Sequence, residues 1–542
     1  MKYILRMISY YNDLLYIFVL KQNTFIFFKY LLYLMFNTDY NMTGETAPEF
    51  PEGYIWLNTT YPLSLRSLRG NVVLLDFWTY CCINCMHMLP ILSNLEEKYK
   101  NKNFIVIGVH SAKFINEEEP ANIKEAIDRY DIQHPVIVDE SMHIWEQYEV
   151  KAWPTFVIID PEQKILYRFE EEIPQMYLEK IIDKIIEKGR IDKVLSSKPP
   201  TIKKGKNGDK PTLFYYPGKL SFSRSKNDDR VAISDSNHNK IIIASIDNGN
   251  ILDIIGNGQK GFLDGRFNES SFFRPQGILW IDEDTIFVAD TENHAIRKID
   301  LKKKEVTTIA GTGTQGGYIR YGAEVAGRTC SLSSPWDLAM YKDRVFIAMA
   351  GLHQIWYLDI NSQKVSPYAG DGTENLVNGA LMESRFAQPS GLSMEKDMLY
   401  VADSESSSIR FIDLKKHYTG TIVGKGLFEF GYEDGALNNA KLQHPIGIDS
   451  NNRNIYVADT YNNAIRFIDI EKREMKTIIG TKDVHSVCRF DDPHCDILGL
   501  YEPSDVKIHV NKLYIADTNN HLIRSFDMRT SLLKTVKLKF PI

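Results

Sequence analysis

The chain has 542 residues, of which 44% are hydrophobic and 25% are charged, and its formal net charge is −6. This length predicts two to four domains, and the composition is that of a globular protein rather than a disordered or fibrous one. The acidic total disfavours a nucleic-acid partner. Six cysteines are too few for the disulfide framework of a secreted protein, so we expect a cytosolic protein.

Residues 1–43 are rich in Tyr, Phe, Leu and Ile and form a divergent N-terminal extension. Lys21 and Lys29 interrupt the apolar runs, so no stretch reaches the roughly 18 residues of a membrane span. No alanine precedes Ala47, so a cleavage site of the A-x-A type is missing. Three interpretations remain open: an interfacial or partner-binding helix, a poorly ordered segment, or a true start at Met42. We assign the extension no function.

Residues 44–190 alternate between apolar strands and amphipathic helices, which predicts an α/β domain. Residues 54–70 predict a short hairpin that leads into the central strand. The strands that follow are expected at residues 71–78, 103–114 and 135–139, and the helices at residues 86–99, 122–130 and 142–148. A second hairpin after Pro154 and a helix at residues 177–188 complete the predicted domain.

A C-x-x-C motif begins at Cys82 and ends at Cys85, between a predicted strand and a predicted helix. A helix N-terminus carries partial positive charge, which favours the thiolate, the reactive form of cysteine. The spacing of three residues brings the second sulfur close enough for a disulfide. We therefore expect Cys82 to attack and Cys85 to resolve. Asp76, on the preceding strand, can accept the proton of Cys85.

Pro154 stands about 70 residues downstream, in "KAWPTFVIID", directly before an apolar strand. An X-Pro bond at a strand start is a candidate for the cis form. Asp76, the C-x-x-C motif and Pro154 together resemble the thioredoxin fold, and the large region 103–148 resembles its TlpA and peroxiredoxin branch. The resemblance implies a catalytic redox site at these four residues, with Trp153 beside it.

Two features depart from the thioredoxin pattern. Cys81 stands where thioredoxins have Trp, and Ile83-Asn84 replaces their Gly-Pro pair, so the redox potential and direction stay open. A bridge between adjacent cysteines would be strained, which favours Cys82–Cys85. A vestigial domain with structural thiols is the alternative. The motif is a poor zinc site, because only His87 is near as a further ligand.

Residues 191–212 are rich in Lys, Pro and Gly and form a linker, whereas residues 213–542 repeat one pattern six times. Each copy places an acid after a strand, as in "VADTENHAIRKID", and successive copies are 54 to 59 residues apart. A proline opens each four-stranded unit. One four-stranded sheet cannot bury both faces alone, so we predict a six-bladed β-propeller. The repeated acids are Asp235, Asp290, Asp403, Asp459 and Asp517, and Met349 replaces them in a degenerate copy.

The repeats resemble NHL repeats, and the two parts in this order resemble the family of NHL-repeat-containing protein 2 from residue 48 to about residue 540. The predicted fold is therefore a multidomain one, α/β followed by all-β. The resemblance also implies a further C-terminal β domain in relatives, which we expect this chain to lack because it ends at Ile542.

The polar turns after the five acids and the long glycine-rich connections between units are predicted to open at one rim. We interpret Asp290, Asp403, Asp459 and Asp517 as turn caps that pair with arginines seven residues later. The rim is then a surface for a protein client or complex partner. The loop 481–498 contains two His and two Cys residues, and three interpretations remain open: a zinc site, a Cys488–Cys495 disulfide, or an exposed insertion in which these residues occur by coincidence. Its candidate ligands are His485, Cys488, His494 and Cys495, and the predicted arginine partners are Arg297, Arg410, Arg466 and Arg524.

The function that we expect is thiol–disulfide exchange on a protein client, with the propeller as docking platform and a role in cellular homeostasis or development. We expect no cofactor and no metal. The alternative is a non-enzymatic interaction scaffold. RNA binding, known for some NHL propellers, needs a basic rim and is disfavoured by the Asp-rich turns.

Overall fold

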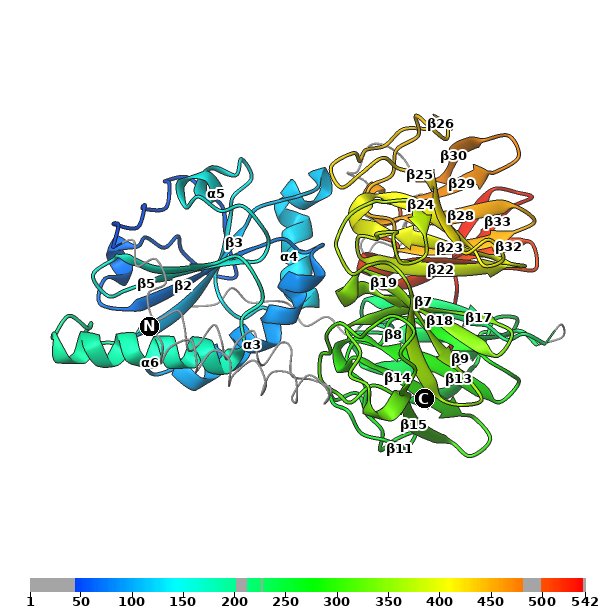
Figure 1. Cartoon of the computed structure of the whole chain (residues 1–542), viewed down its shortest axis with the longest axis horizontal. Coiled ribbons are helices and arrows are strands. Elements are labelled where there is room, and N and C mark those ends of the chain that lie inside the picture. Colours follow the sequence, from blue (N-terminus) through cyan, green and yellow to red (C-terminus); the bar gives the residue numbers. More distant parts are fainter. Residues whose placement is uncertain (1–43, 201–211, 226–227, 481–498, 540–542) are drawn as a thin grey trace, which may run out of the picture.

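The computed structural model describes residues 44–200, 212–225, 228–480 and 499–539. In these residues a thioredoxin-like domain precedes a six-bladed β-propeller, as the sequence predicts (Figure 1). The predicted N-terminal extension and the loop that contains Cys488 and Cys495 lie outside the described residues.

The thioredoxin-like domain contains a six-stranded mixed sheet in the order β1-β4-β3-β2-β5-β6. The central strand β2 is parallel to β3 and antiparallel to β5, and β3 is parallel to β4. All seven residues of β2 are buried, as expected for a strand covered on both faces. The strands are β1 (Trp56–Leu57), β2 (Val72–Trp78), β3 (Phe104–His110), β4 (Val136–Val138), β5 (Thr155–Ile159) and β6 (Ile165–Phe169).

Alternate residues of the sheet contribute to two separate cores, because successive side chains of a strand point to opposite faces. Val72 and Leu74 pack with three helices, α3 (Ile83–Tyr99), α4 (Pro120–Arg129) and α6 (Gln175–Ile191). Val73, Leu75 and Phe77 pack with α5 (His143–Gln147) and with the segment 47–68.

The predicted hairpin at residues 54–70 is wrong. Trp56 and Leu57 form β1, which pairs with Ile137 and Val136 of β4 at the far edge of the sheet. Asn58 then turns the chain at φ 56°, and its side-chain amide donates to the carbonyl oxygens of Ile132 and His134 at 2.8 and 2.9 Å. These bonds tie the chain after β1 to the residues just before β4. Residues 56–58 therefore extend the sheet at its edge instead of forming a hairpin.

Each blade of the propeller is an antiparallel sheet of four consecutive strands, and four blades add a two-residue outer strand. The short strands β11, β16, β21 and β26 supply these outer edges. The strands are β7 (Pro217–Phe222), β8 (Arg230–Asp235), β9 (Lys240–Ser245) and β10 (Ile251–Ile255) in blade 1; β11 (Gly265–Arg266), β12 (Ile278–Trp280), β13 (Thr285–Asp290), β14 (Ala295–Asp300) and β15 (Glu305–Ala310) in blade 2; β16 (Val325–Ala326), β17 (Pro335–Tyr341), β18 (Arg344–Met349), β19 (Gln354–Asp359) and β20 (Lys364–Ala369) in blade 3; β21 (Gly379–Ala380), β22 (Pro389–Glu395), β23 (Met398–Asp403), β24 (Ser408–Asp413) and β25 (Tyr418–Val423) in blade 4; β26 (Gly435–Ala436), β27 (Gly447–Asn451), β28 (Asn454–Asp459), β29 (Ala464–Asp469) and β30 (Glu474–Ile479) in blade 5; and β31 (Asp505–His509), β32 (Lys512–Asp517), β33 (Leu522–Asp527) and β34 (Leu532–Thr535) in blade 6.

The five repeated aspartates occupy one position, the last residue of the second full-length strand, and Met349 occupies it in blade 3. Each carboxylate accepts a backbone N–H from the segment that enters its blade, and the Met349 sulfur takes this place at 3.3 Å from the Ser333 nitrogen. Three of the aspartates also pair with buried arginines: Asp290 with Arg297, Asp403 with Arg410 and Asp459 with Arg466. Asp235 pairs with His238, and Arg524 makes no hydrogen bond to Asp517 within the described part of blade 6.

The residue before each blade-opening proline has a positive φ, between 43° and 58°, in all six blades. A side chain can hold this unusual backbone conformation only if its neighbours compensate for it. Here the backbone N–H of each such residue donates to a side chain of the preceding blade. The bond from Tyr216 to His521 joins blade 1 to blade 6 and closes the ring. The pairs are Tyr216 with His521, Arg274 with Asn239, Ser334 with His294, Gln388 with His353, His444 with Ser407 and Glu502 with Asn463.

These bonds contribute to stability. Asn463→Ala removes the acceptor of the buried Glu502 N–H, whose bond to Asn463 Oδ1 is 2.7 Å long. Leaving a buried N–H without a partner costs about 1–3 kcal/mol. We expect the free energy of propeller unfolding in urea to fall by that amount relative to Asn452→Ala. Asn452 is an exposed residue at a similar φ of 52°, so both variants carry the same backbone cost. Equal stabilities would contradict the role of the bond.

Candidate redox site against the propeller

Cys82 is the N-cap residue of α3, directly after the loop that follows β2. Its sulfur accepts a hydrogen bond from the Cys85 backbone N–H at 3.4 Å, so the thiol lies at the positive end of the helix. Cys82 is half-buried, whereas Cys81 and Cys85 are buried. It is therefore the most accessible of the three cysteines.

Cys85 and Asp76 lie behind Cys82 in the domain core. No disulfide joins any of the four cysteines among the described residues. Burial raises the pKa of Cys85 well above its usual range, and the neighbouring Cys82 and Asp76 raise it further. Burial also raises the pKa of Asp76 to about 7, although the nearby His134 acts to lower it. A carboxyl with that pKa can exchange a proton with a thiol near neutral pH.

Pro154 lies beside the C-x-x-C motif. The Trp153–Pro154 peptide is cis, and the Trp153 carbonyl oxygen is 3.9 Å from the Cys82 sulfur. Trp153 is held by its indole N–H, which donates to the Ser111 carbonyl oxygen at 3.0 Å. Asp76, Cys82, Cys85 and Pro154 thus meet at one end of the sheet.

Cys81 faces away from this group, toward the propeller. Its side chain is fully buried, and its backbone N–H donates to Glu117 Oε1 at 2.9 Å. Burial raises the pKa of the Cys81 thiol well above its usual range, and Glu117 and Glu405 add to the effect. Glu405 belongs to the propeller. Its charge therefore acts on the loop between β2 and α3, residues 79–82, which we call the redox loop.

Gln388 of the propeller binds the backbone on both sides of Cys82. Its side-chain oxygen accepts the Ile83 N–H at 2.9 Å, and its side-chain nitrogen donates to the Cys81 carbonyl oxygen at 2.9 Å. Both bonds are buried, so water does not compete for these groups. The amide therefore fixes the loop that carries Cys82.

Gln388 is one of six equivalent contacts. The six residues with positive φ before the blade-opening prolines form what we call the pre-proline ring, and each member reaches the thioredoxin-like domain. Tyr216 bonds Glu125 at 2.8 Å, Arg274 stacks on Tyr130, Ser334 bonds His87 at 2.8 Å, Gln388 binds the redox loop, His444 packs edge-on against Phe114, and Glu502 pairs with Arg129 at 2.6 Å.

The strongest of these contacts is a buried ionic cluster around Glu502. The carboxylate is fully buried and accepts from Arg129, from the Tyr80 hydroxyl at 3.1 Å and from the Asn116 amide at 2.8 Å. A second buried pair joins Lys113 to Glu405. Buried ion pairs are stable only when fully bonded, so these clusters fix one relative placement of the two domains.

The sequence analysis did not single out the pre-proline ring. A signal existed: the position before each repeated proline holds a different polar residue in every copy, whereas the flanking strand positions are near copies. Variation at one position of an otherwise uniform repeat indicates a contact with a non-repeating partner. The polar face that we expected to bind a protein client is largely occupied by the chain's own thioredoxin-like domain.

A thioredoxin-like family model matches residues 70–165. Over 533 residues, NHL repeat-containing protein 2 of Homo sapiens is 40% identical to this chain, and the match covers 91% of this chain and 72% of that protein. The chain belongs to the NHL repeat-containing protein 2 family. A second relative, protein SUPPRESSOR OF QUENCHING 1, chloroplastic, of Arabidopsis thaliana, is 40% identical over 518 residues, covering 92% of this chain but only 48% of that protein.

The redox domain also has relatives of its own. Thiol-disulfide oxidoreductase ResA of Bacillus cereus is 28% identical over 123 residues, which are 23% of this chain and 68% of that protein. Among the helices that the structure describes, none is long and apolar enough to cross a membrane.

In this member of the NHL repeat-containing protein 2 family, Glu502→Ala is expected to release the redox loop. The change leaves the buried Arg129 charge uncompensated, which costs about 3–5 kcal/mol, and raises the undocked fraction at least about tenfold. The buried Cys81 then reacts faster with iodoacetamide, by the same factor, in a timed alkylation followed by mass spectrometry. Glu471→Ala, which breaks the exposed pair with Arg453, is the control. An unchanged labelling rate of Cys81 would show that Glu502 does not hold the domains together.

Asp76 is expected to make stability depend on pH. Its pKa in the folded state is about 7 and its ordinary value is 3.8, so folding favours the protonated carboxyl. The stabilisation is complete below about pH 4 and is lost as the pH rises through about 7. The free energy of unfolding of Asp76→Asn, relative to that of the wild type, should therefore be higher at pH 8 than at pH 5 by a few kcal/mol. Urea denaturation of both proteins at the two pH values measures this difference. The exposed Asp192→Asn should show no such gain, and a pH-independent difference for Asp76→Asn would contradict the assignment.

Proposed function

We propose that the protein exchanges thiols and disulfides with a protein client through Cys82 and Cys85. The observation that carries the proposal is the asymmetry of the site. The half-buried Cys82 caps a helix beside the Trp153 carbonyl, whereas Cys85 lies in the core near Asp76. The name of the relative ResA, a thiol-disulfide oxidoreductase, supports the same reaction class.

In the reducing direction the Cys82 thiolate attacks one sulfur of a client disulfide. A mixed disulfide forms, and the other client sulfur leaves as a thiolate. Cys85 then loses its proton to Asp76 and attacks the Cys82 sulfur, which breaks the mixed disulfide. The client gains two electrons and becomes a dithiol, and the Cys82–Cys85 disulfide remains. The oxidising direction is the reverse of these steps, and the sequence of the intervening pair leaves the direction open.

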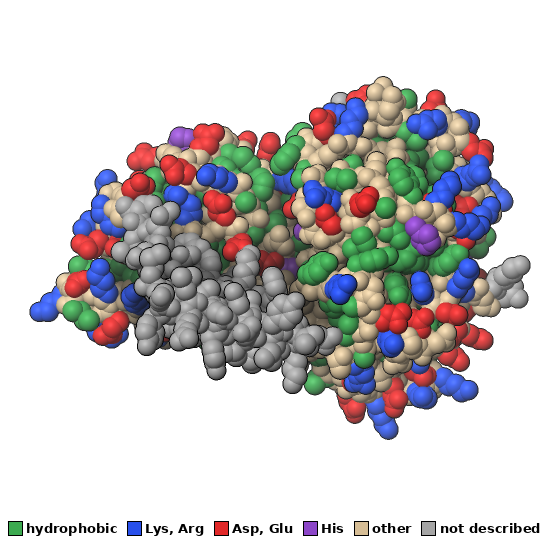
Figure 2. Space-filling view, in the orientation of Figure 1, with side chains coloured by type: hydrophobic (Ala, Val, Ile, Leu, Met, Phe, Trp, Pro, Cys, Tyr) green, Lys and Arg blue, Asp and Glu red, His purple; other side chains and the backbone are tan. Residues whose placement is uncertain are grey.

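The propeller serves as the docking platform for the client. The inner polar face already holds the redox domain, so the client would bind the outer rim of the blades or approach when the domains separate. We place the protein in the cytosol, in cellular homeostasis or development. Acidic and basic side chains are interspersed over the visible surface of both domains (Figure 2), which gives no support to RNA binding.

A non-enzymatic scaffold is the second candidate. The observation in its favour is the tight burial of the redox loop, with Gln388 bonded on both sides of Cys82. In that case the cysteines stabilise the docked arrangement and turn over no client.

A trapping experiment separates the two functions. Cys85→Ser removes the resolving thiol, so mixed disulfides with clients persist and are recovered from cells under non-reducing conditions. Cys82→Ser/Cys85→Ser should trap none. In the reduced wild type, a short iodoacetamide pulse should label Cys82 before Cys81 and Cys85. Equal recovery from both variants, together with equally slow labelling of the three thiols, would refute the exchange reaction and favour the scaffold.

A further inference from the structure

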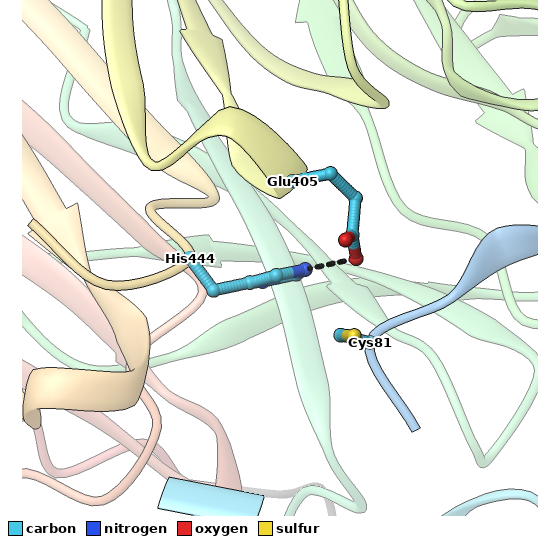
Figure 3. A group of neighbouring side chains, drawn as sticks. All are labelled: Cys81, Glu405 and His444. Carbon is cyan, nitrogen blue, oxygen red and sulfur yellow. Dashed lines mark ion pairs between the residues drawn. The ribbon is translucent and has the colours of Figure 1, made fainter. Parts of the chain in front are cut away.

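Three metal-binding side chains meet where the redox loop touches the propeller. Cys81 comes from the loop before α3, Glu405 from the short turn after β23, and His444 from the pre-proline ring (Figure 3). One sulfur, one carboxylate oxygen and one imidazole nitrogen all lie within 4.8 Å of one another. Tetrahedral zinc with these ligands needs separations of roughly 3.3–3.6 Å. A contraction of at most about 1.5 Å would thus bring them onto one ion.

Two of these side chains are buried without the hydrogen bonds that buried groups normally make. His444 is 2% exposed, and neither of its ring nitrogens has a hydrogen-bond partner among the described residues. Glu405 Oε1 likewise has none in the part of the chain described, and it lies 3.4 Å from His444 Nε2. These two atoms form an ion pair beside the Cys81 sulfur (Figure 3), and neither makes a hydrogen bond within the described residues.

A catalytic role for this group is excluded by access. The Cys81 side chain is fully buried, and Phe114 and Tyr461 stack around the imidazole, so no substrate disulfide can approach the sulfur while the domains are docked. A metal ion needs far less room. A cavity of about 50 Å³ borders His444, Tyr80 and Gln388, although neither Cys81 nor Glu405 lines it.

We propose that Cys81, Glu405 and His444 bind a zinc ion that joins the thioredoxin-like domain to the propeller. The sulfur, nitrogen and oxygen ligand set suits zinc. Three protein ligands leave a fourth position for water. The sequence analysis expected no metal, and this group is hidden in the sequence because Cys81 lies more than 300 residues before Glu405 and His444.

The surroundings balance the charge of such an ion. Lys113 pairs with Glu405 Oε2, which leaves Oε1 for the metal and orients the carboxylate, and Glu374 lies 3.8 Å from the same ammonium. Zn²⁺ and Lys113 then face three negative charges, on the Cys81 thiolate, Glu405 and Glu374. Metal binding displaces the Cys81 proton, so the affinity should rise with pH.

The test uses the full chain, reduced and stripped of metal, titrated with Co²⁺ as a spectroscopic probe and then with Zn²⁺ in competition. The expected result is one bound equivalent and a near-ultraviolet cobalt–thiolate band. Cys81→Ser should lose the band, and His444→Gln and Glu405→Gln should lose the bound equivalent. A matched control replaces Cys82, Cys85, Cys488 and Cys495 with Ser and should keep both.

X-ray absorption at the zinc edge of the wild-type protein adds a measurement that needs no variant. One sulfur among nitrogen and oxygen ligands is expected. Two or more sulfurs, a band that survives Cys81→Ser, a band lost in the four-cysteine control, or no bound metal in the wild type would each overturn the site.

Discussion

The backbone before each blade-opening proline has a conformation that few residues adopt, and both halves of the molecule depend on it. Because φ is positive there, the N–H points back to the preceding blade and finds a side-chain acceptor, and the side chain is presented to the thioredoxin-like domain. Gln388 shows both roles. Its N–H bonds His353 of the adjacent blade, and its amide holds the redox loop. Blade closure and domain docking therefore share the same six positions.

The docked interface combines an apolar cluster with buried charged groups, and this determines how it can open. Ile83 and Met86 pack with Trp336 and Ile446 of the propeller, and this cluster contributes by the area that it buries. Buried ion pairs also hold the arrangement, and Glu502 with Arg129 and Glu405 with Lys113 are the most buried of those between the domains. Such pairs stabilise one relative position of the two domains. A partial separation is strongly disfavoured, because each charge loses its ion-pair partner before water can hydrate it. The domains are thus expected to be either docked or well apart.

The sequence predicted the parts of the molecule in which local patterns determine the outcome. The C-x-x-C between strand and helix, and the six copies that end a strand in Asp, depend on neighbouring residues alone. The segment 54–70 was predicted wrongly because β1 pairs with β4, a strand about 80 residues away, and nothing local indicates that pairing. The contacts between the loop that carries the C-x-x-C motif and the propeller could not be predicted, for the same reason. Cys81 meets Glu405 and His444 only after both domains have folded and docked.

Because Cys81 and Cys82 are adjacent, one loop carries two sulfurs that have different surroundings. The backbone at Cys82 is extended, at φ −77° and ψ 114°, so side chains of consecutive residues point to opposite sides. Cys82 consequently faces Trp153, while Cys81 faces Glu405 and the propeller. A thiol bound to a metal at Cys81 would not compete with exchange at Cys82, and it would anchor the loop one residue from the reacting sulfur. The cysteine that replaces the usual Trp of thioredoxins is then the residue that couples the redox loop to the second domain.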